Sequence, residues 1–260
     1  MAEHEPTTTA PEDDEFYIGY MAEAPAGVAG HAKRWIFIVL ATIWSAAALV
    51  AVAQRPFAVA FFDFGAPRAY EGVLEAWPHP MLRVDRPGAD NASSVYYLVG
   101  FGKHGAESDV QEFWGQRVKL EGTPIYRDNQ TMLEVVAGSV ETLDDNPAIT
   151  KTASVPLGRH TLKGEIVDSK CHFGVMKPGN LKPHRACATL CIRGGIPPVF
   201  IVRQEDGGVR HLLLVGSDGR ALNNEILDWI AEPMEITGEL IKMDDLFMLK
   251  AEPASFKSVS

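Results

Sequence analysis

The chain aligns with itself over two stretches, LVGFGKHGAESDVQEFWGQRVKLEGTPIYRDNQTML (98–133) and LVGSDGRALNNEILDWIAEPMEITGELIKMDDLFML (214–249). No gap is needed, and every residue of the second stretch lies 116 positions after its counterpart. Identities are few, but glycine and aspartate positions coincide, as at Gly122 with Gly238 and at Asp128 with Asp244. The pattern predicts that one folding unit occurs twice, in residues 66–143 and 157–255.

Each unit is predicted to be a small β structure. An alternating strand comes first (AYEGVLEAW; LKGEIVD), and one or two apolar strands follow it. A short amphipathic helix is expected next (ESDVQEFW; NNEILDWI), with Ser108 and Asn223 or Asn224 as N-caps. Two more strands, joined by turn-forming residues, close the unit. This order is that of an OB-fold, a small partly open barrel, and another small β-barrel or a sandwich is the alternative.

One segment of the second unit has no counterpart in the first. Upstream of the aligned stretches, Tyr70–Leu74 resembles Leu162–Ile166 at an offset of only 92, so the second unit holds about 24 additional residues. They fall in KCHFGVMKPGNLKPHRACATLCIRGGIPP (170–198), and we assign the insert to residues 169–198. The insert contains all three cysteines of the chain. Because the insert is an addition to a repeated scaffold, we expect the function to lie there.

A helix is expected inside the insert. Pro183 suits the first helical position, and Gly194-Gly195 supply a stop after Ile192. At about 100° per residue, the positions of His184, Cys187 and Cys191 fall within one arc of roughly 60° on this helix. Cys171 follows directly on the first strand of the unit and is expected to meet that arc.

These side chains form a candidate metal site. Three thiolates and one imidazole are a sufficient tetrahedral set for Zn²⁺, and soft thiolates also suit Cu(I). The neighbouring histidine offers a further donor. The predicted metal ligands are Cys171, His172, His184, Cys187 and Cys191.

Other interpretations of the cluster remain open. The arc could be a buried face on which cysteine acts as a small hydrophobe. In an oxidising compartment Cys171 could pair with Cys187 or Cys191 and leave one thiol over. Cys171 beside His172 could also be a reactive thiol. The spacing fits none of the stereotyped zinc-finger, Rieske, c-type haem or C-x-x-C motifs.

The basic side chains of the insert, which either attract an anion or acidic partner or are simply solvated, are Lys170, Lys177, Lys182, Arg185 and Arg193.

A charge-free run, WIFIVLATIWSAAALVAVA (35–53), precedes the two units. As a helix it spans about 28 Å, close to the hydrocarbon thickness of a bilayer. Lys33 and Arg34 precede it, so the positive-inside rule places the N-terminus in the cytoplasm. We expect a single transmembrane helix at 35–54 in an inner membrane, with the C-terminal units in the periplasm. A cleaved signal peptide ending at Ala51-Val52-Ala53 is the alternative.

Residues 1–34 are rich in Pro, Thr, Ala, Asp and Glu, which predicts a disordered acidic tail on the cytoplasmic side. Its apolar side chains at 16–20 are expected to contact a partner or the membrane surface, although an ordinary juxtamembrane tail is an equal alternative.

The linker between the units is assigned to 144–158. A net charge of −10 at pH 7 argues against nonspecific nucleic-acid binding, which needs a basic face.

The runs GEIVDSKC, HRACATLC and GGIPPVFIV resemble those of a group of uncharacterised bacterial exported proteins. Those proteins are small OB-like domains with a V-D-x-x-C start and a downstream C-A-x-x-C segment. The resemblance covers residues 160–252, and the first unit matches as a degenerate copy without cysteines. FYIGYM before an apolar run is similar to a feature of membrane-anchored hypothetical proteins of proteobacteria. The resemblance implies a fold and a placement, and no reaction.

Together these features predict a membrane-anchored accessory or metal-binding subunit of a bacterial envelope assembly, a redox assembly included, with a protein partner. No acid/base constellation or phosphate-cradling glycine loop is visible, so an enzyme that uses Cys171 is an alternative rather than the main expectation. A further alternative is an OB-like module, stapled by a disulfide, that binds a ligand or protein. Its ligand could be a saccharide stacked on Trp77 or on Tyr96 and Tyr97.

Overall fold

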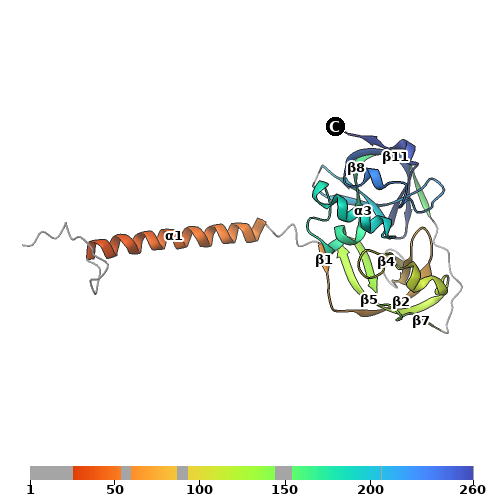
Figure 1. Cartoon of the computed structure of the whole chain (residues 1–260), viewed down its shortest axis with the longest axis horizontal. Helices are drawn as coiled ribbons and strands as arrows, with labels where there is room; N and C mark the ends of the chain where they lie inside the picture. The colour runs from red at the N-terminus through yellow and green to blue at the C-terminus, as the bar shows by residue number, and fades with distance from the viewer. Residues whose placement is uncertain (1–25, 54–59, 87–92, 144–153, 206, 260) are drawn as a thin grey trace, which may run out of the picture. The chain divides into compact units, whose positions relative to one another are not determined.

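The computed structural model describes residues 26–53, 60–86, 93–143, 154–205 and 207–259. The chain divides into two compact units, Met1–Ala58 and Val59–Ser260 (Figure 1). The aromatic side chains expected in the acidic tail lie outside the described residues.

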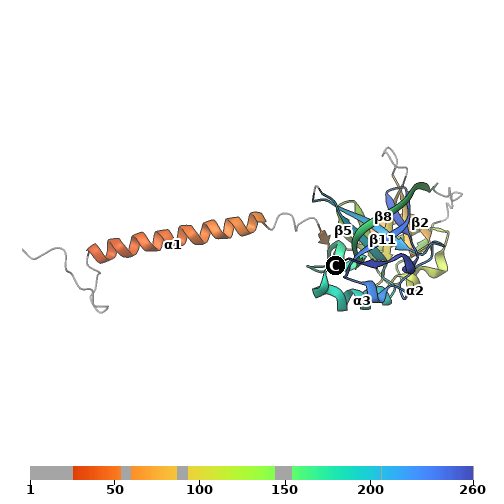
Figure 2. The same ribbon diagram turned by 90° about the horizontal axis from the view of Figure 1, so that it is seen from above.

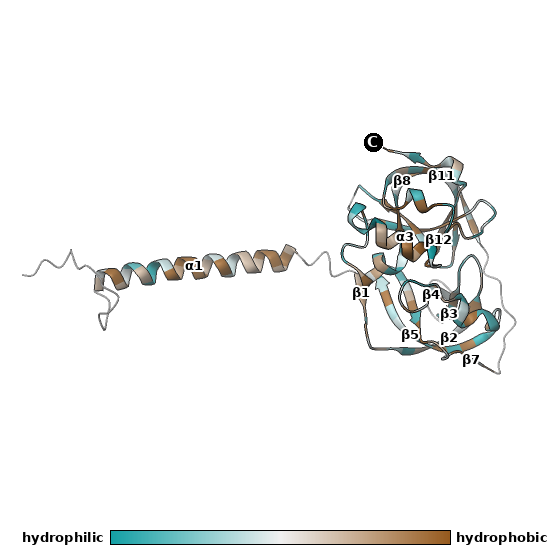
Figure 3. Cartoon of the chain, in the orientation of Figure 1, coloured by the Kyte–Doolittle hydropathy of each residue, from teal (hydrophilic) through white to brown (hydrophobic). Residues whose placement is uncertain are grey.

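The first unit contains helix α1 (Ala26–Ala53), which has no buried side chain. Apolar residues occupy most of its length (Figure 3). The hydroxyls of Thr42 and Ser45 donate to carbonyls one turn earlier, at 2.9 and 2.8 Å, so these donors are satisfied within the helix. Among the described residues, α1 is the one helix long and apolar enough to cross a membrane, although a signal sequence would meet the same criterion. Residues 26–34, expected in the disordered tail, are helical.

The second unit is mainly β and contains two closed five-stranded barrels, as predicted. The first barrel is built from β1 (Ala60–Phe62), β2 (Arg68–Glu75), β3 (Met81–Asp85), β4 (Ser93–Val99), α2 (Glu107–Val110), η2 (Gln111–Phe113), β5 (Arg117–Arg127), β6 (Gln130–Val135) and β7 (Glu141–Thr142). Strands β2, β3, β4, β6 and β5 pair in that order, and β5 pairs with β2 to close the barrel. The short strands β1 and β7, which the sequence did not predict, are added to β5.

The second barrel is built from β8 (Val155–Asp168), η3 (Cys171–Val175), η4 (Lys182–His184), α3 (Arg185–Arg193), β9 (Pro198–Arg203), β10 (Val209–Val215), η5 (Leu227–Trp229), β11 (Pro233–Met243), β12 (Leu246–Lys250), η6 (Pro253–Ser255) and β13 (Lys257–Ser258). Its closing pair, β8 with β11, runs antiparallel over most of both strands (Figure 2). Strand β8 begins inside the stretch expected to be a linker.

The two barrels use the same strand register. In the first, β4 and β6 pair in parallel with Leu98 opposite Leu133. In the second, β10 and β12 pair in parallel with Leu214 opposite Leu249. Each leucine of the second pair lies 116 positions after its counterpart in the first pair, which is the offset of the sequence alignment. The hairpin turns correspond as well, since Asp128 and Asp244 both have φ 52°.

The helices between the third and fourth strands differ from expectation. Residues 107–113 form only the short α2 and η2, and α2 has no side-chain cap, so Ser108 is not the N-cap. In the second barrel, η5 is the one short helix described in the stretch 223–230. Asn223 does not cap it; its amide donates to the carbonyls of Ile192 and Ile196 instead. Asn223 does form side-chain hydrogen bonds, but its partners lie in the insert and not in the predicted helix.

The core consists of three clusters of buried side chains, one inside each barrel and one between the barrels. Strand β10 serves two of them, because Leu212 and Leu214 point into its own barrel while Leu213 and Val215 join the shared cluster. This double burial explains its continuous apolar sequence. The shared cluster also contains Phe173, so the insert is part of the contact between barrels.

Polar contacts between the barrels are reciprocal. The β11–β12 turn of the second barrel reaches the start of β4, where the Ser93 hydroxyl donates to Asp244 at 2.7 Å. The corresponding turn of the first barrel reaches the start of β10, where Asp128 lies 4.0 Å from the His211 Nε2 atom. Each barrel therefore presents the same face to the other.

Candidate metal centre

The insert lies in the connection between the first two strands of the second barrel. Residues 169–197 join β8 to β9, whereas residues 76–80 alone join the corresponding strands β2 and β3. The difference of 24 residues equals the change of offset in the alignment. The added chain forms η3, η4 and α3, and it packs between the barrels (Figure 1).

Hydrogen bonds fix the insert at both ends. The backbone N–H and the hydroxyl of Ser169 both donate to the Pro197 carbonyl, at 3.2 and 2.7 Å. Helix α3 ends at Gly194 and Gly195, as predicted, and Gly195 has φ 99°. A side chain at Gly194 would overlap the Lys103 carbonyl, so glycine is required where the first barrel meets the helix end. The site is therefore held by both barrels.

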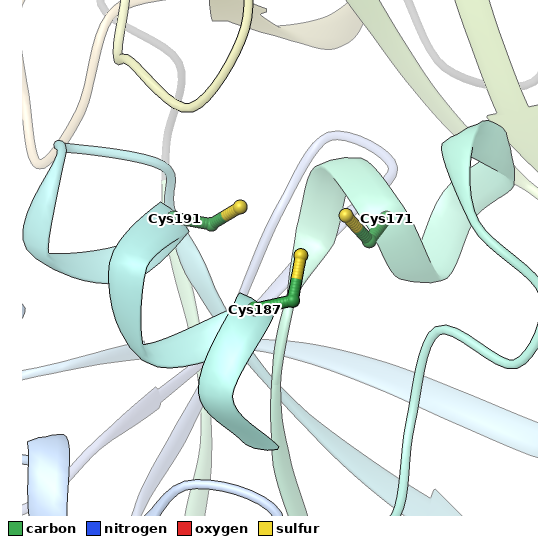
Figure 4. Close-up of side chains that lie close together, drawn as sticks. All are labelled: Cys171, Cys187 and Cys191. Carbon is green, nitrogen blue, oxygen red and sulfur yellow. The ribbon is translucent and has the colours of Figure 1, made fainter. Parts of the chain in front are cut away.

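The three cysteine sulfurs converge from two helical segments. Cys171 opens the π-helical turn η3, while Cys187 and Cys191 project from successive turns of α3 (Figure 4). Their Sγ atoms all lie within 4.8 Å of one another. Cys171 and Cys191 are buried and Cys187 is half-buried, and none of the three carries a disulfide. The sequence prediction that these residues meet is confirmed.

An Asp–His pair adjoins the sulfurs. Asp168, fully buried at the end of β8, accepts the backbone N–H of Cys171 at 2.8 Å. Its other oxygen lies 2.9 Å from the Nε2 atom of buried His184. Donor atoms of Asp168, Cys171 and His184 also lie within 4.8 Å of one another. Cys171 thus belongs to two overlapping groups, each of which could hold a metal ion.

A lysine from the first barrel contacts the cysteines. Lys103 Nζ donates to Cys187 Sγ at 2.7 Å and lies 3.7 Å from Cys191 Sγ. The hydrogen bond to Cys187 raises the lysine pKa. A hydrogen bond from Cys171, with help from the Lys103 charge, lowers the pKa of Cys191. The pKa of Cys171 is raised, because it donates that bond and is buried. The Lys103 charge therefore favours a thiolate in the Cys171–Cys191 pair.

His172 makes its contacts with residues of both barrels. Its Nε2 atom lies 3.2 Å from Nε2 of His211, and the Arg127 guanidinium donates to its carbonyl at 2.6 Å. Burial and the Arg127 charge lower the pKa of both histidines, that of His211 to about 4. His172 belongs to neither group of close donor atoms. Its place is in the contact between the barrels, although sequence adjacency to Cys171 suggested a ligand.

The basic side chains of the insert do not form a uniform cationic rim. Lys170 is buried and binds the carbonyls of Gly100 and Gly102, both at 2.8 Å, together with the Glu134 carboxylate. Lys182 and Arg185 lie beside the Glu232 carboxylate. Most of this charge is therefore used to join the insert to its surroundings.

Each of the two groups could hold a metal ion. The three sulfurs form one group, and the His184 imidazole joins Cys171 and the Asp168 carboxylate in the other. A histidine that binds a metal commonly donates its other ring N–H to such a carboxylate. The sequence did not single out Asp168 or Lys103. Asp168 stood within the V-D-x-x-C motif, but Lys103 lies 84 residues from Cys187 and gave no sequence signal.

The aromatic candidates for saccharide stacking are dispersed. Tyr97 is buried in the shared cluster and Tyr96 packs in the first barrel, while Trp77 is about half exposed. These three side chains do not form one stacking surface. In comparisons with known proteins, the chain matches no family model, no curated protein and no solved structure.

Proposed function

We propose that this chain is a membrane-anchored metal-binding protein and an accessory subunit of a bacterial envelope assembly. The metal ion, Zn²⁺ or Cu(I), is held by Cys171, Cys187 and Cys191 with His184 as the fourth ligand. Helix α1 anchors the chain, and the barrels lie on the periplasmic side. Both barrels are OB-fold variants, an assignment supported by five closed strands with a helical connection after the third.

The convergence of three sulfurs within 4.8 Å is the observation that carries this proposal. Buried cysteines are common as simple hydrophobes, but three of them at this spacing beside a buried Asp–His pair supply the thiolate and imidazole donors of a tetrahedral Zn²⁺ site. The positive charge of Lys103 offsets part of the negative charge of three thiolates. Since this lysine comes from the other barrel, metal binding and barrel packing are expected to support each other.

Elemental analysis of the purified full chain, together with a free-thiol count, tests the proposal. About one Zn or Cu per chain is expected, with loss of the metal in Cys187→Ser and His184→Asn. Cys187 is half-buried, so its replacement should leave the fold intact, which circular dichroism would check.

His172→Asn is the matched control. It changes the histidine next to Cys171, yet this side chain faces His211, so the variant should retain the metal. A folded wild-type chain without metal, or loss of metal in His172→Asn but not in His184→Asn, would overturn the ligand set.

A disulfide-stapled module is the second candidate, favoured by the same closeness of the sulfurs. It predicts one free thiol and no bound metal when the chain is purified without reductant. The thiol count distinguishes the two functions, because a metal site yields three free thiols once acid has released the metal.

A further inference from the structure

Three aromatic side chains are exposed where the second unit begins. Phe61 is 44% exposed, Phe64 79% and Tyr126 42%. Phe61 in β1 lies opposite Tyr126 in β5, and their ring centroids are 5.3 Å apart. Phe64, in the turn after β1, lies beside Phe62, with 5.5 Å between ring centroids. We call the exposed side chains of Phe61, Phe64 and Tyr126 together the aromatic edge. Exposed aromatic groups of this kind commonly mark a contact surface.

The position of the aromatic edge along the chain indicates what covers it. Six residues, 54–59, separate the end of α1 from the start of β1. Even fully extended, this segment spans at most about 25 Å. If α1 crosses a bilayer, as proposed above, the aromatic edge is tethered within that distance of the hydrocarbon boundary. Aromatic side chains are enriched at this depth, among the lipid headgroups.

The charges beside the aromatic edge are already paired. Arg68 forms an ion pair with Asp63, and Arg127 lies 4.0 Å from Asp128. Since neither sign dominates, contact with a membrane would depend on burial of the aromatic rings and not on anionic lipid.

We propose that the aromatic edge inserts into the headgroup region of the membrane that α1 spans, so that the first barrel rests on the lipid surface. This inference rests on the anchoring part of the proposed function. The backbone of Phe61 packs against Gly174, where a side chain would come within 2.6 Å of it. Gly174 lies in η3, the turn that begins at Cys171. The turn η3 thus connects the aromatic edge to the cysteine cluster.

Photo-cross-linking of the full chain in vesicles of zwitterionic phosphatidylcholine tests the proposal. A benzophenone derivative of phenylalanine replaces Phe64 in one sample and Trp77 in a matched control. Trp77 is 53% exposed but follows β2 at the other end of β5. A third sample carries the probe at Trp44 in α1. Mass spectrometry of the labelled peptides detects lipid adducts.

Lipid adducts at positions 64 and 44, with several-fold fewer at 77, are the expected result. Adducts at 44 but not at 64, or equal adducts at 64 and 77, would overturn the docking and leave the anchor intact. Cross-links from 64 to a second copy of the chain would overturn it in favour of a self-association surface. Absence of adducts at 44 would instead refute the membrane anchor itself.

Discussion

At the scale of single residues, Asp168 connects the fold to the candidate metal centre. One carboxylate oxygen accepts the backbone N–H of Cys171 and the other contacts His184. The side chain therefore positions a sulfur and an imidazole at once, although it was not among the predicted ligands. A V-D-x-x-C motif on its own does not show that the aspartate side chain accepts the backbone N–H of the cysteine.

We predict that Asp168→Asn weakens metal binding and stability together. The amide retains one acceptor oxygen but cannot serve both partners as a carboxylate does. Loss of a hydrogen bond to a charged group costs about 1.5–3 kcal/mol, and loss of a carboxylate behind a metal-binding histidine costs roughly 10- to 100-fold in affinity. Urea unfolding and competition with a metallochromic chelator measure the two effects. Unchanged affinity in a folded variant would exclude His184 as a ligand held by Asp168.

Buried histidines predict a pH dependence of stability. Burial lowers the pKa of His79 to about 4, and that of His211 falls to about 4 as well. Each is therefore neutral in the folded chain and takes up a proton on unfolding below its ordinary pKa near 6.5. The stability is complete above pH 6.5 and is lost as the pH falls toward 4, by up to about 1.4 kcal/mol per pH unit for each histidine.

Urea unfolding at several pH values between 7.5 and 5 checks this dependence. His79→Asn should reduce the slope by the share of one histidine. A wild-type stability that rises as the pH falls would contradict the prediction.

At the scale of elements, the strands were predictable and the short helices were not. Alternating or continuous apolar runs mark every barrel strand, because each strand is buried on one face or on two. The end of helix α3 was predictable from Gly194-Gly195, which act locally, whereas Pro183 lies in η4, the turn before α3, and not at its first position. The stretch 223–230 had helical periodicity, but Asn223 is held by the insert, a long-range contact that the local sequence does not encode.

We expect Asn223→Ala to loosen the C-terminal end of α3. The amide donates to two carbonyls, at 2.7 and 2.9 Å, and both would lose this donor. The cost should be about 1–3 kcal/mol. Hydrogen exchange of α3 and the thermal midpoint report the change. Asn224→Ala, at an exposed neighbouring position, is the control and should have little effect; equal effects of the two variants would refute the assignment.

At the scale of the whole second unit, the barrels are expected to unfold together. Phe173 of the insert lies 5.8 Å from Tyr97 of the first barrel and 5.5 Å from His211 of the second, measured between ring centroids. It is fully buried between them. The sequence predicted two barrels but not their contact, since apolar residues for a shared core look like those of a strand interior.

Phe173→Ala should cost about 3–5 kcal/mol, as expected for a large cavity in a core. Because the cavity lies in the shared cluster, amide protection should fall in β4 and β10 alike, which hydrogen exchange followed by mass spectrometry resolves. Phe101→Ala, at a side chain 79% exposed, should be nearly neutral. Protection lost in one barrel only would show that the barrels are independent.

The reciprocal faces of the barrels have a consequence for how such a protein can change. Two separate identical chains, joined through this face, would have to be alike on both sides, so any enlarged loop would occur twice. Covalent fusion removes that obligation. The short loop 76–80 on one side and the long segment 169–197 on the other coexist because each half is encoded separately. The second barrel can therefore carry an enlarged loop with additional functional side chains, while the first barrel retains the short loop and the fold that supports it.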